Sequence, residues 1–365
     1  MNILRTIICV IGTRPEAIKM VPVIRALEAS TWARCVVVAT AQHREMLDQM
    51  LQRFNVVVDY DLNLMQANQG LNQLLACMLP ELDNIIKKEK PYALIAQGDT
   101  TTVFGSALAA FNAQIPFGHV EAGLRTYNLK HPFPEEGYRQ MISKIAHWNF
   151  APTELAANTL IKEGVLKEKV FVTGNTCIDT LLMAVNQLPP VNKTQEKIIV
   201  LTVHRREIFG QPLENVFKTI LKILEDFKNV KVIYPVHPNP HVKNLAHSLL
   251  VHPRIILKDP LNYFDFVDLL RQADLILTDS GGIQEEAPAL GKPVFVIRET
   301  TERPEPISAG RAKLVGTNED YIYHQVSSLL LNEDLYREMA KPYFPYGNGD
   351  AAKKIISILQ AELEV

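Results

Sequence analysis

The sequence is poor in cysteine, and the few cysteines it has are far apart. Cys9, Cys35, Cys77 and Cys177 form no CxxC pair, and their neighbours are mostly apolar. This spacing indicates buried thiols in a reducing compartment rather than a framework of disulfides.

The chain also lacks a large excess of charge of either sign. It has 38 Lys and Arg against 40 Asp and Glu, which leaves a formal charge of −2. A general binder of nucleic acid or of an anionic membrane surface carries a basic excess, so we expect neither partner. Any anionic ligand must be held by a local site.

Long apolar runs are absent as well. No stretch approaches the roughly 18 apolar residues that a membrane helix needs. The apolar run at residues 6–11 is too short and wrongly flanked for a signal peptide. Together with the cysteine pattern, these absences predict a cytoplasmic protein that does not enter a membrane.

Several common catalytic and nucleotide-binding motifs are missing. The sequence has no GxGxxG, no GxxxxGK[ST] and no GxSxG. A standard dinucleotide fingerprint, a P-loop and a serine nucleophile elbow are therefore not supported. No repeat of solenoid period and no low-complexity tract is present.

What the chain does contain is material for two α/β domains. Its 365 residues, 47% hydrophobic and 21% charged, suffice for two cores. Short runs rich in Val and Ile alternate with helical patterns, which predicts parallel sheets of βαβ units. The expected strands are residues 7–11, 35–40, 93–96, 117–120 and 170–172 in the first half, and 198–203, 231–234, 255–257, 275–277 and 294–297 in the second.

A break between these halves predicts the domain boundary. Residues 187–194 contain the pair Pro189-Pro190 and interrupt both periodicities. We therefore expect domains at 1–187 and 188–345. The tail at 350–365 has the pattern of a final helix.

Polar residues follow the predicted strands as a set. In open α/β sheets, ligands bind beyond the carboxyl ends of the strands, so these residues predict a common binding cleft. Solvation of exposed loops is the alternative interpretation. In the first half they are Arg14, Gln42, His43, Gly98, Asp99, His119 and Glu121, and in the second His204, Arg205, Arg206, Glu207, His237, Asp279, Ser280, Gly281 and Gly282.

Two strand-to-helix junctions suit an anion. Asp279-Ser280-Gly281-Gly282 opens a helix whose free N–H groups can bind phosphate or, with Glu286, ribose hydroxyls, although Ser280 can equally serve as a simple helix N-cap. At residues 12–19, Pro15 suits the first helical position. Arg14 and Lys19 are available there either to an anion or to solvent.

Three further patterns leave their alternatives open. The proline-stiffened segment 131–136 can hold Glu135 and its neighbour at a cleft or expose both to solvent. His237 and His241 lie four apart, but the intervening prolines disfavour the regular helix that would align them on a metal. Asp59-Tyr60-Asp61 is similar to the DxD metal motif of some sugar-nucleotide transferases.

Taken together, seven blocks resemble the bacterial, non-hydrolysing UDP-N-acetylglucosamine 2-epimerases. They are GTRPEAIKM at 12–20, AQHREML at 41–47, GDTT at 98–101, GHVEAGLR at 118–125, HRRE at 204–207, TDSGGIQEE at 278–286 and PYGNG at 345–349. The resemblance implies two Rossmann-like doubly wound domains of the glycosyltransferase-B type, with the active site in the interdomain cleft. It also implies a last helix, at about 346–365, that crosses back to the first domain, and a homodimer.

The resemblance further implies reversible inversion at C2 of UDP-N-acetylglucosamine to give UDP-N-acetylmannosamine for surface polysaccharides such as capsule. The C2 proton is not next to a carbonyl within the ring, so simple deprotonation would form a poorly stabilised carbanion. Elimination of UDP to a 2-acetamidoglucal, followed by re-addition, avoids it. This route needs acid/base groups at C2 and positive groups on the pyrophosphate, and it implies no cofactor and no metal.

The resemblance also implies individual site residues, from their positions in the matching motifs. Asp99, Glu121 and Glu135 resemble the acid/base and structural carboxylates, and which of them removes the C2 proton stays open. His204 resembles the histidine on the diphosphate, and the UDP-sugar contacts implied are Arg14, Lys19, Phe266 on uracil, Ser280, Gly281 and Gly282 on phosphate, Glu286 on ribose, and Arg303 on nucleotide or sugar. In the non-hydrolysing branch a second UDP-N-acetylglucosamine can bind as an activator, through residues like Gln42, His43 and Arg205.

Other functions remain as alternatives. A 2-epimerase of a related UDP-2-acetamido sugar, such as a diacetamido uronic acid, keeps the reaction and changes the substrate. A glycosyltransferase of the same fold would transfer to an acceptor without C2 exchange. A non-catalytic UDP-sugar sensor would bind nucleotide without turnover.

Overall fold

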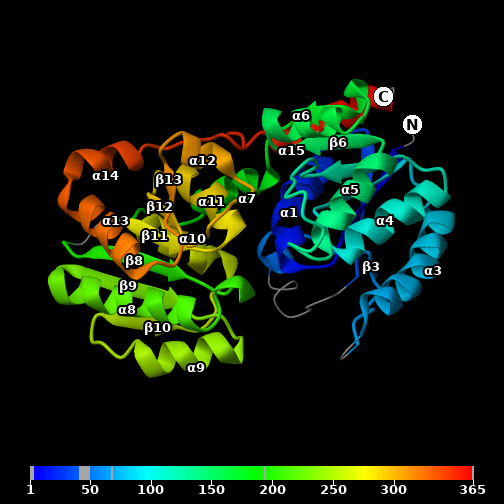
Figure 1. Ribbon diagram of the computed structural model, residues 1–365. Coiled ribbons are helices and arrows are strands. Elements are labelled where there is room, and N and C mark those ends of the chain that lie inside the picture. Colours follow the sequence, from blue (N-terminus) through cyan, green and yellow to red (C-terminus); the bar gives the residue numbers. More distant parts are fainter. Residues whose placement is uncertain (1–3, 41–49, 67–68, 193–194, 364–365) are drawn as a thin grey trace. The chain divides into compact units, whose positions relative to one another are not determined.

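The computed structural model describes residues 4–40, 50–66, 69–192 and 195–363. The chain forms two compact units (Figure 1). Unit 1 comprises Met1–Leu182 with Tyr346–Val365, and unit 2 comprises Met183–Pro345. Within the described residues, no helix is long and apolar enough to span a bilayer.

Unit 1 is built on a sheet of parallel strands in the order β3-β2-β1-β4-β5-β6-β7. The strands are β1 (Arg5–Ile11), β2 (Ala33–Ala39), β3 (Tyr60–Asp61), β4 (Ala93–Gln97), β5 (Phe117–Val120), β6 (Trp148–Ala151) and β7 (Val170–Val172). The central strand β1 is almost wholly buried. A strand covered on both faces explains the unbroken apolar run that predicted it.

Helices cover the sheet of unit 1 (Figure 1), and several of them contribute buried apolar residues to its core clusters. They are α1 (Arg14–Glu28), α3 (Leu71–Glu89), α4 (Thr101–Asn112), α5 (Glu135–Ile145), α6 (Glu154–Lys162), α7 (Thr176–Val185) and α15 (Ala351–Glu362), with a 3₁₀ turn at Lys167–Lys169. Threonine hydroxyls cap the N-termini of α1, α4 and α6. The last helix, α15, packs on α1 at the other end of the sequence.

Unit 2 repeats the plan with the order β10-β9-β8-β11-β12-β13. Its strands are β8 (Lys197–Thr202), β9 (Val230–Pro235), β10 (Ile255–Lys258), β11 (Leu275–Thr278), β12 (Val294–Val296) and β13 (Ala312–Leu314). Its helices are α8 (Gln211–Asp226), α9 (Pro240–Leu249), α10 (Tyr263–Gln272), α11 (Gly281–Ala289), α12 (Pro304–Ser308), α13 (Glu319–Leu331) and α14 (Glu333–Met339), with a 3₁₀ turn at Arg206–Ile208. Apolar clusters cover both faces of this sheet.

The predicted fold class, α/β with two Rossmann-like doubly wound sheets, is confirmed. In each sheet the strand order reverses between two central strands, β1 and β4 in unit 1 and β8 and β11 in unit 2. Such a switch point is where an open α/β sheet binds its ligand. The polar segments after these four strands are therefore the first place to look for function.

All ten predicted strands are present, and three observed strands were missed. β3 has two residues, β6 carries Asn149 beside Trp148, and β13 carries Lys313. These strands lack the Val and Ile runs on which the prediction depended. Of the two aspartates considered above as a metal motif, Asp59 precedes β3 and Asp61 is its last residue. The Asp59 carboxylate accepts a hydrogen bond from Val37 N at 2.8 Å.

Candidate active site

The turn between β1 and α1 is organised by a buried carboxylate. Glu16 Oε2 accepts from Gly12 N at 2.6 Å and from Thr13 N at 3.2 Å, which completes a capping box with Thr13. Glu16 Oε1 accepts from the hydroxyl of Thr100, the N-cap of α4, at 2.6 Å. Burial raises the pKa of Glu16 to about 7, against these hydrogen bonds, which favour the ionised form.

This capping box places two predicted substrate residues on the same helix. Arg14 is the first residue of α1, and Lys19 lies just over one turn later. The helix begins one residue earlier than predicted, because Thr13 is its N-cap, so Pro15 occupies the second helical position rather than the first. Proline is tolerated there because the first turn has no intrahelical partners for its N–H groups.

Glu121 follows β5 and is held by side chains from three other segments. Lys19 Nζ and Asn175 Nδ2 donate to its Oε1 at 2.5 and 2.8 Å, and Gln97 Nε2 donates to its Oε2. The side chains of both members of the Lys19–Glu121 ion pair are largely buried, 14% and 7% exposed. A charge-assisted pair with this little water is shorter and stronger than a surface pair.

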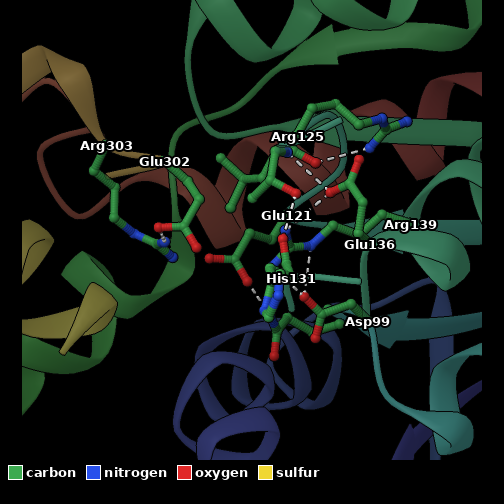
Figure 2. A network of polar contacts seen from close by, with 12 residues as sticks. Asp99, Glu121, Arg125, His131, Glu136, Arg139, Glu302 and Arg303 are labelled. Atoms are coloured by element: carbon green, nitrogen blue, oxygen red, sulfur yellow. Dashed lines mark hydrogen bonds and ion pairs between the residues drawn. The ribbon is translucent and has the colours of Figure 1, made fainter. Parts of the chain in front are cut away.

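Asp99, two residues beyond β4, is paired with Arg139 of α5. Arg139 Nε donates to Asp99 Oδ2 at 2.7 Å, and its Nη1 reaches Glu136 Oε2 at 3.4 Å (Figure 2). Glu136 is fully buried and accepts from the backbone N–H groups of Thr126 and Tyr127. This glutamate therefore anchors the loop that precedes α5.

The adjacent Glu135 differs from its neighbour. It is the first residue of α5, and its Oε2 atom is buried with no hydrogen-bond partner within the described residues. A buried oxygen without a partner is costly, and it is the kind of group that a ligand can satisfy. Glu135 thus has one oxygen available for proton transfer.

His119, on β5, links the loops that carry Asp99 and Glu121. Its Nε2 lies 2.7 Å from the carbonyl oxygen of Gly98, which can only accept, so Nε2 carries the proton. Burial lowers the pKa of His119 to about 4, so the ring is neutral at physiological pH. It supplies a hydrogen bond to the β4 end without adding charge to the site.

In unit 2, Asp279 binds the backbone of the segment that follows β8. Its Oδ2 accepts from His204 N at 2.7 Å and Arg205 N at 2.8 Å, and its Oδ1 lies 3.1 Å from His204 Nδ1. Burial opposes ionisation, but the hydrogen bonds and charge of His204 hold the pKa of Asp279 below its usual range. With Nδ1 facing Asp279, the Nε2 atom of His204 is directed away from this carboxylate.

Two flanking groups complete the surroundings of His204. The ring of His237 stacks on that of His204, with centroids 5.2 Å apart. Burial and His204 lower the pKa of His237, which favours a neutral ring there. Burial followed by the charge of Arg298 likewise lowers the pKa of Arg205.

The N-terminus of α11 is lined by glycine and arginine. Ser280 is the N-cap, but its side chain makes no capping hydrogen bond. The Arg303 guanidinium lies against Gly281, where an added Cβ would come within 2.8 Å of Nη1, whereas the space beside Gly282 is open. The helix start therefore offers N–H groups, an adjacent cation and room for an anion.

Arg303 is fixed by two glutamates. Its Nε donates to Glu285 Oε1 at 2.6 Å, and its Nη1 lies 3.6 Å from Glu302 Oε2, a pair labelled in Figure 2. Although burial favours the neutral acid, the charges of Arg303 and Arg298 lower the pKa of Glu302 to about 2. Ionised Glu302 therefore orients both guanidinium groups.

The remaining nucleotide candidates lie on α10 and α11. Tyr263 Oη donates to Glu286 Oε1 at 2.8 Å, which fixes one carboxylate oxygen. Phe266, on the same helix as Tyr263, is half-buried against the core of unit 2 and so retains exposed ring surface. Gln42 and His43, predicted for an activator, lie outside the described residues.

The family model described as UDP-N-acetylglucosamine 2-epimerase matches residues 25–360. The chain belongs to this 2-epimerase family. Relatives with that name share 47% identity in Bacillus subtilis, covering 97% of this chain and 94% of the relative, and 44% in Escherichia coli, covering 97% and 98%. A crystal structure of UDP-GlcNAc 2-epimerase from Neisseria meningitidis bound to UDP-GlcNAc matches with a TM-score of 0.92 and 43% identity, covering 98% of this chain and 100% of that chain.

Four residues of this 2-epimerase family member contact the predicted carboxylates or their loops and were missed as site residues. They are Glu16, Gln97, Arg139 and Asn175. Gln97 ends β4 and Asn175 follows β7, so the strand-end rule, applied to every predicted strand, would have found both. Glu16 and Arg139 lie within helices, where the sequence gives no signal that separates them from capping or surface residues.

Proposed function

We propose that this chain catalyses the reversible C2 epimerisation of UDP-N-acetylglucosamine to UDP-N-acetylmannosamine. UDP is eliminated across C1–C2 to leave 2-acetamidoglucal, and it then adds back while C2 receives a proton on the other face. Family membership supports the reaction, and the Neisseria relative with UDP-GlcNAc bound supports the substrate class. Elimination and re-addition are redox-neutral, so this route needs no redox cofactor.

The observation that carries the proposal is the group of carboxylates at the strand ends of unit 1. Asp99 and Glu121 follow the neighbouring strands β4 and β5 and are paired with Arg139 and Lys19, while Glu135 has a buried oxygen that no described residue hydrogen-bonds. Inversion at C2 needs proton transfer on two faces of the sugar ring. Because the partners of these carboxylates differ, some of them can transfer protons while others serve as fixed charges.

In the same proposal, unit 2 binds the nucleotide. The N-terminus of α11, with Ser280, Gly281, Gly282 and nearby Arg303, receives phosphate oxygens. Glu286, with one oxygen fixed by Tyr263, accepts from ribose hydroxyls, and Phe266 packs on uracil. His204 stabilises the departing diphosphate, and Arg14 and Lys19 contact the substrate from unit 1.

We further propose the cellular setting that the resemblance implies. A cytoplasmic homodimer would supply UDP-N-acetylmannosamine to surface-polysaccharide synthesis. A second UDP-N-acetylglucosamine would act as an activator through Gln42, His43 and Arg205. Initial rates that rise sigmoidally with UDP-N-acetylglucosamine, and that become hyperbolic in Arg205→Ala, would support the activator site.

Isotope exchange tests the reaction. Purified protein in deuterium oxide with UDP-N-acetylglucosamine should incorporate deuterium at C2 and form the manno epimer. The variant Asp99→Asn should lose roughly 100-fold or more in rate while it still binds UDP, because the nucleotide residues lie in unit 2. Absence of both exchange and manno product in the wild-type protein would falsify the proposal. A panel of UDP-2-acetamido sugars then identifies the preferred substrate.

A further inference from the structure

The backbone of Glu121 is in an unusual conformation, so its carboxylate depends on neighbouring groups for its position. The residue has φ of +65°, in the left-handed region that L residues seldom occupy. Such a conformation costs on the order of 1 kcal/mol and persists where the surroundings over-determine it. The side-chain donors Lys19, Gln97 and Asn175 belong to these surroundings.

The donors come from separate parts of unit 1. Lys19 belongs to α1, and Gln97 ends β4, the immediate neighbour of β5. Asn175 comes from the segment after β7, two strands away from β5 in the sheet. Its Nδ2 reaches Glu121 Oε1 at 2.8 Å, so it connects the far edge of the sheet to this carboxylate.

The orientation of the Asn175 amide is fixed by the start of α7. Its Oδ1 accepts from Cys177 N at 3.2 Å, and the residue is 1% exposed. A flipped amide would direct its oxygen at the Glu121 carboxylate and its NH₂ at the Cys177 N–H. The local structure therefore selects the one rotamer that donates to Glu121.

The backbone of Asn175 is held by the returning C-terminal segment. Asn175 N donates to the Tyr346 carbonyl at 2.6 Å. Gly174 and Gly347, with φ of +93° and +100°, let the two backbones meet, since a Cβ at Gly174 would lie 3.0 Å from the Tyr346 oxygen and 3.2 Å from the Gly347 Cα. Tyr346 is also where the chain re-enters unit 1.

We propose that Asn175 is a positioning residue for Glu121, through which the C-terminal segment at 346–349 determines where that carboxylate lies. Asn175 acts through Glu121 and need not touch the substrate. This inference rests on the proposed function, since it assigns Glu121 a task in the exchange at C2. It extends the site to a residue more than 50 positions away from Glu121 in sequence.

Two substitutions at one position separate this role from simple packing. Asn175→Ala removes the donor and should lower kcat for C2 exchange roughly 10–100-fold, with KM within about twofold of wild type. Asn175→Asp keeps the shape but places a second carboxylate against Glu121. Because two adjacent carboxylates resist double ionisation, the acid limb of its pH–rate profile should move to higher pH.

Asp179→Asn is the matched control. Asp179 lies one turn further along α7, and its carboxylate accepts from Ala351 N and Ala352 N at the start of α15. This variant weakens the same packing between α7 and the C-terminal segment without touching Glu121. It should lower the thermal midpoint and leave the shape of the pH–rate profile unchanged.

The outcomes distinguish failure of the proposed function from failure of the positioning role of Asn175. If wild-type protein shows no exchange, the proposed function fails, whereas wild-type exchange with superposable pH profiles for wild type and Asn175→Asp overturns the positioning role alone. Folding is checked by circular dichroism and UDP binding. If Asn175→Asp does not fold, the kcat and KM of Asn175→Ala and Asn175→Ser decide, and failure of all three to fold shows an architectural residue and also overturns the inference.

Discussion

The carboxyl groups of this chain behave differently because their partners differ. Glu302 lies between two guanidinium groups, and its pKa falls to about 2 despite burial. Glu16 is more deeply buried, its hydrogen bonds come from hydroxyl and backbone groups, and burial raises its pKa to about 7. Hydrogen bonds from neutral donors do not offset the loss of water around a charge as a paired cation does.

Glu16 should therefore make stability depend on pH in a defined direction. Its pKa in the folded protein exceeds that of an unfolded glutamate, so the folded state binds more protons between about pH 4.5 and 7. The associated stabilisation is present below this range and is lost as pH rises through about 7. Relative to Glu16→Gln, wild-type protein should lose roughly 2–3 kcal/mol of unfolding free energy between pH 5 and 8.

Unfolding curves for the two proteins across this pH range measure the effect. Glu28→Gln removes an exposed carboxylate from the same helix and serves as the control, because little burial accompanies that group. We expect the unfolding free energy of the Glu16→Gln variant to increase relative to that of wild type as pH rises. A difference that stays constant with pH, or changes as it does for Glu28→Gln, would contradict the assignment.

At the level of elements, the sequence predicted what depends on local pattern and missed what depends on distant contacts. Val and Ile runs predicted the buried central strands, and the strand-end rule selected Asp99, Glu121 and His204 as candidate site residues. The edge strand β13, with Lys313, has no such run, because an edge strand is less completely covered. The pairing of Asp99 with Arg139 and of Glu121 with Asn175 joins residues 40 and 54 positions apart, which periodicity cannot detect.

The docking of the C-terminal segment on the β7–α7 connection should be sensitive to one methyl group. Gly174→Ala puts an L residue at φ of +93° and drives its Cβ to 3.0 Å from the Tyr346 carbonyl oxygen, where backbone atoms face it. We expect a loss of roughly 2–4 kcal/mol, because backbone strain and overpacking add. Amides of α15 should exchange with deuterium faster, since their anchor is displaced.

A second glycine separates the cost of backbone strain from the cost of overpacking. Gly164 has φ of +84° with nothing within 4 Å of an added Cβ, so Gly164→Ala meets the conformational cost alone. It should cost about 1 kcal/mol and leave exchange in α15 at the wild-type rate. Equal losses in the two variants would show that the segment tolerates the contact at Gly174.

At the scale of the molecule, one unit is continuous in sequence and the other is not. All strands of the second sheet lie within Met183–Pro345, together with their covering helices. Unit 1 is interrupted after Leu182 and resumes at Tyr346, and its last helix packs on its first. Sequence periodicity indicated that α15 is a helix, and the family resemblance implied that it returns to the first domain. Its contacts with α1 and α7 show that it packs within unit 1.

This arrangement makes unit 2 an insertion into unit 1 and predicts that unit 1 can fold without it. The two ends of the insertion are close within unit 1, because a Cβ at Gly349 would come within 2.6 Å of the Leu182 side chain. A chimera of residues 1–182 joined to 346–365 by a short Gly–Ser linker should unfold cooperatively, whereas residues 1–182 alone should not, since α1 and α7 then expose the face that α15 covers.

The complementary fragment, residues 183–345, should fold and bind UDP. It should catalyse no C2 exchange, because it lacks the carboxylates Asp99, Glu121 and Glu135 of unit 1. Calorimetry of the three chains and titration with UDP measure these outcomes. Identical melting of residues 1–182 and the chimera would show that α15 is dispensable to unit 1. Failure of residues 183–345 to bind UDP would show that nucleotide binding needs residues of unit 1, with Arg14 and Lys19 the first candidates.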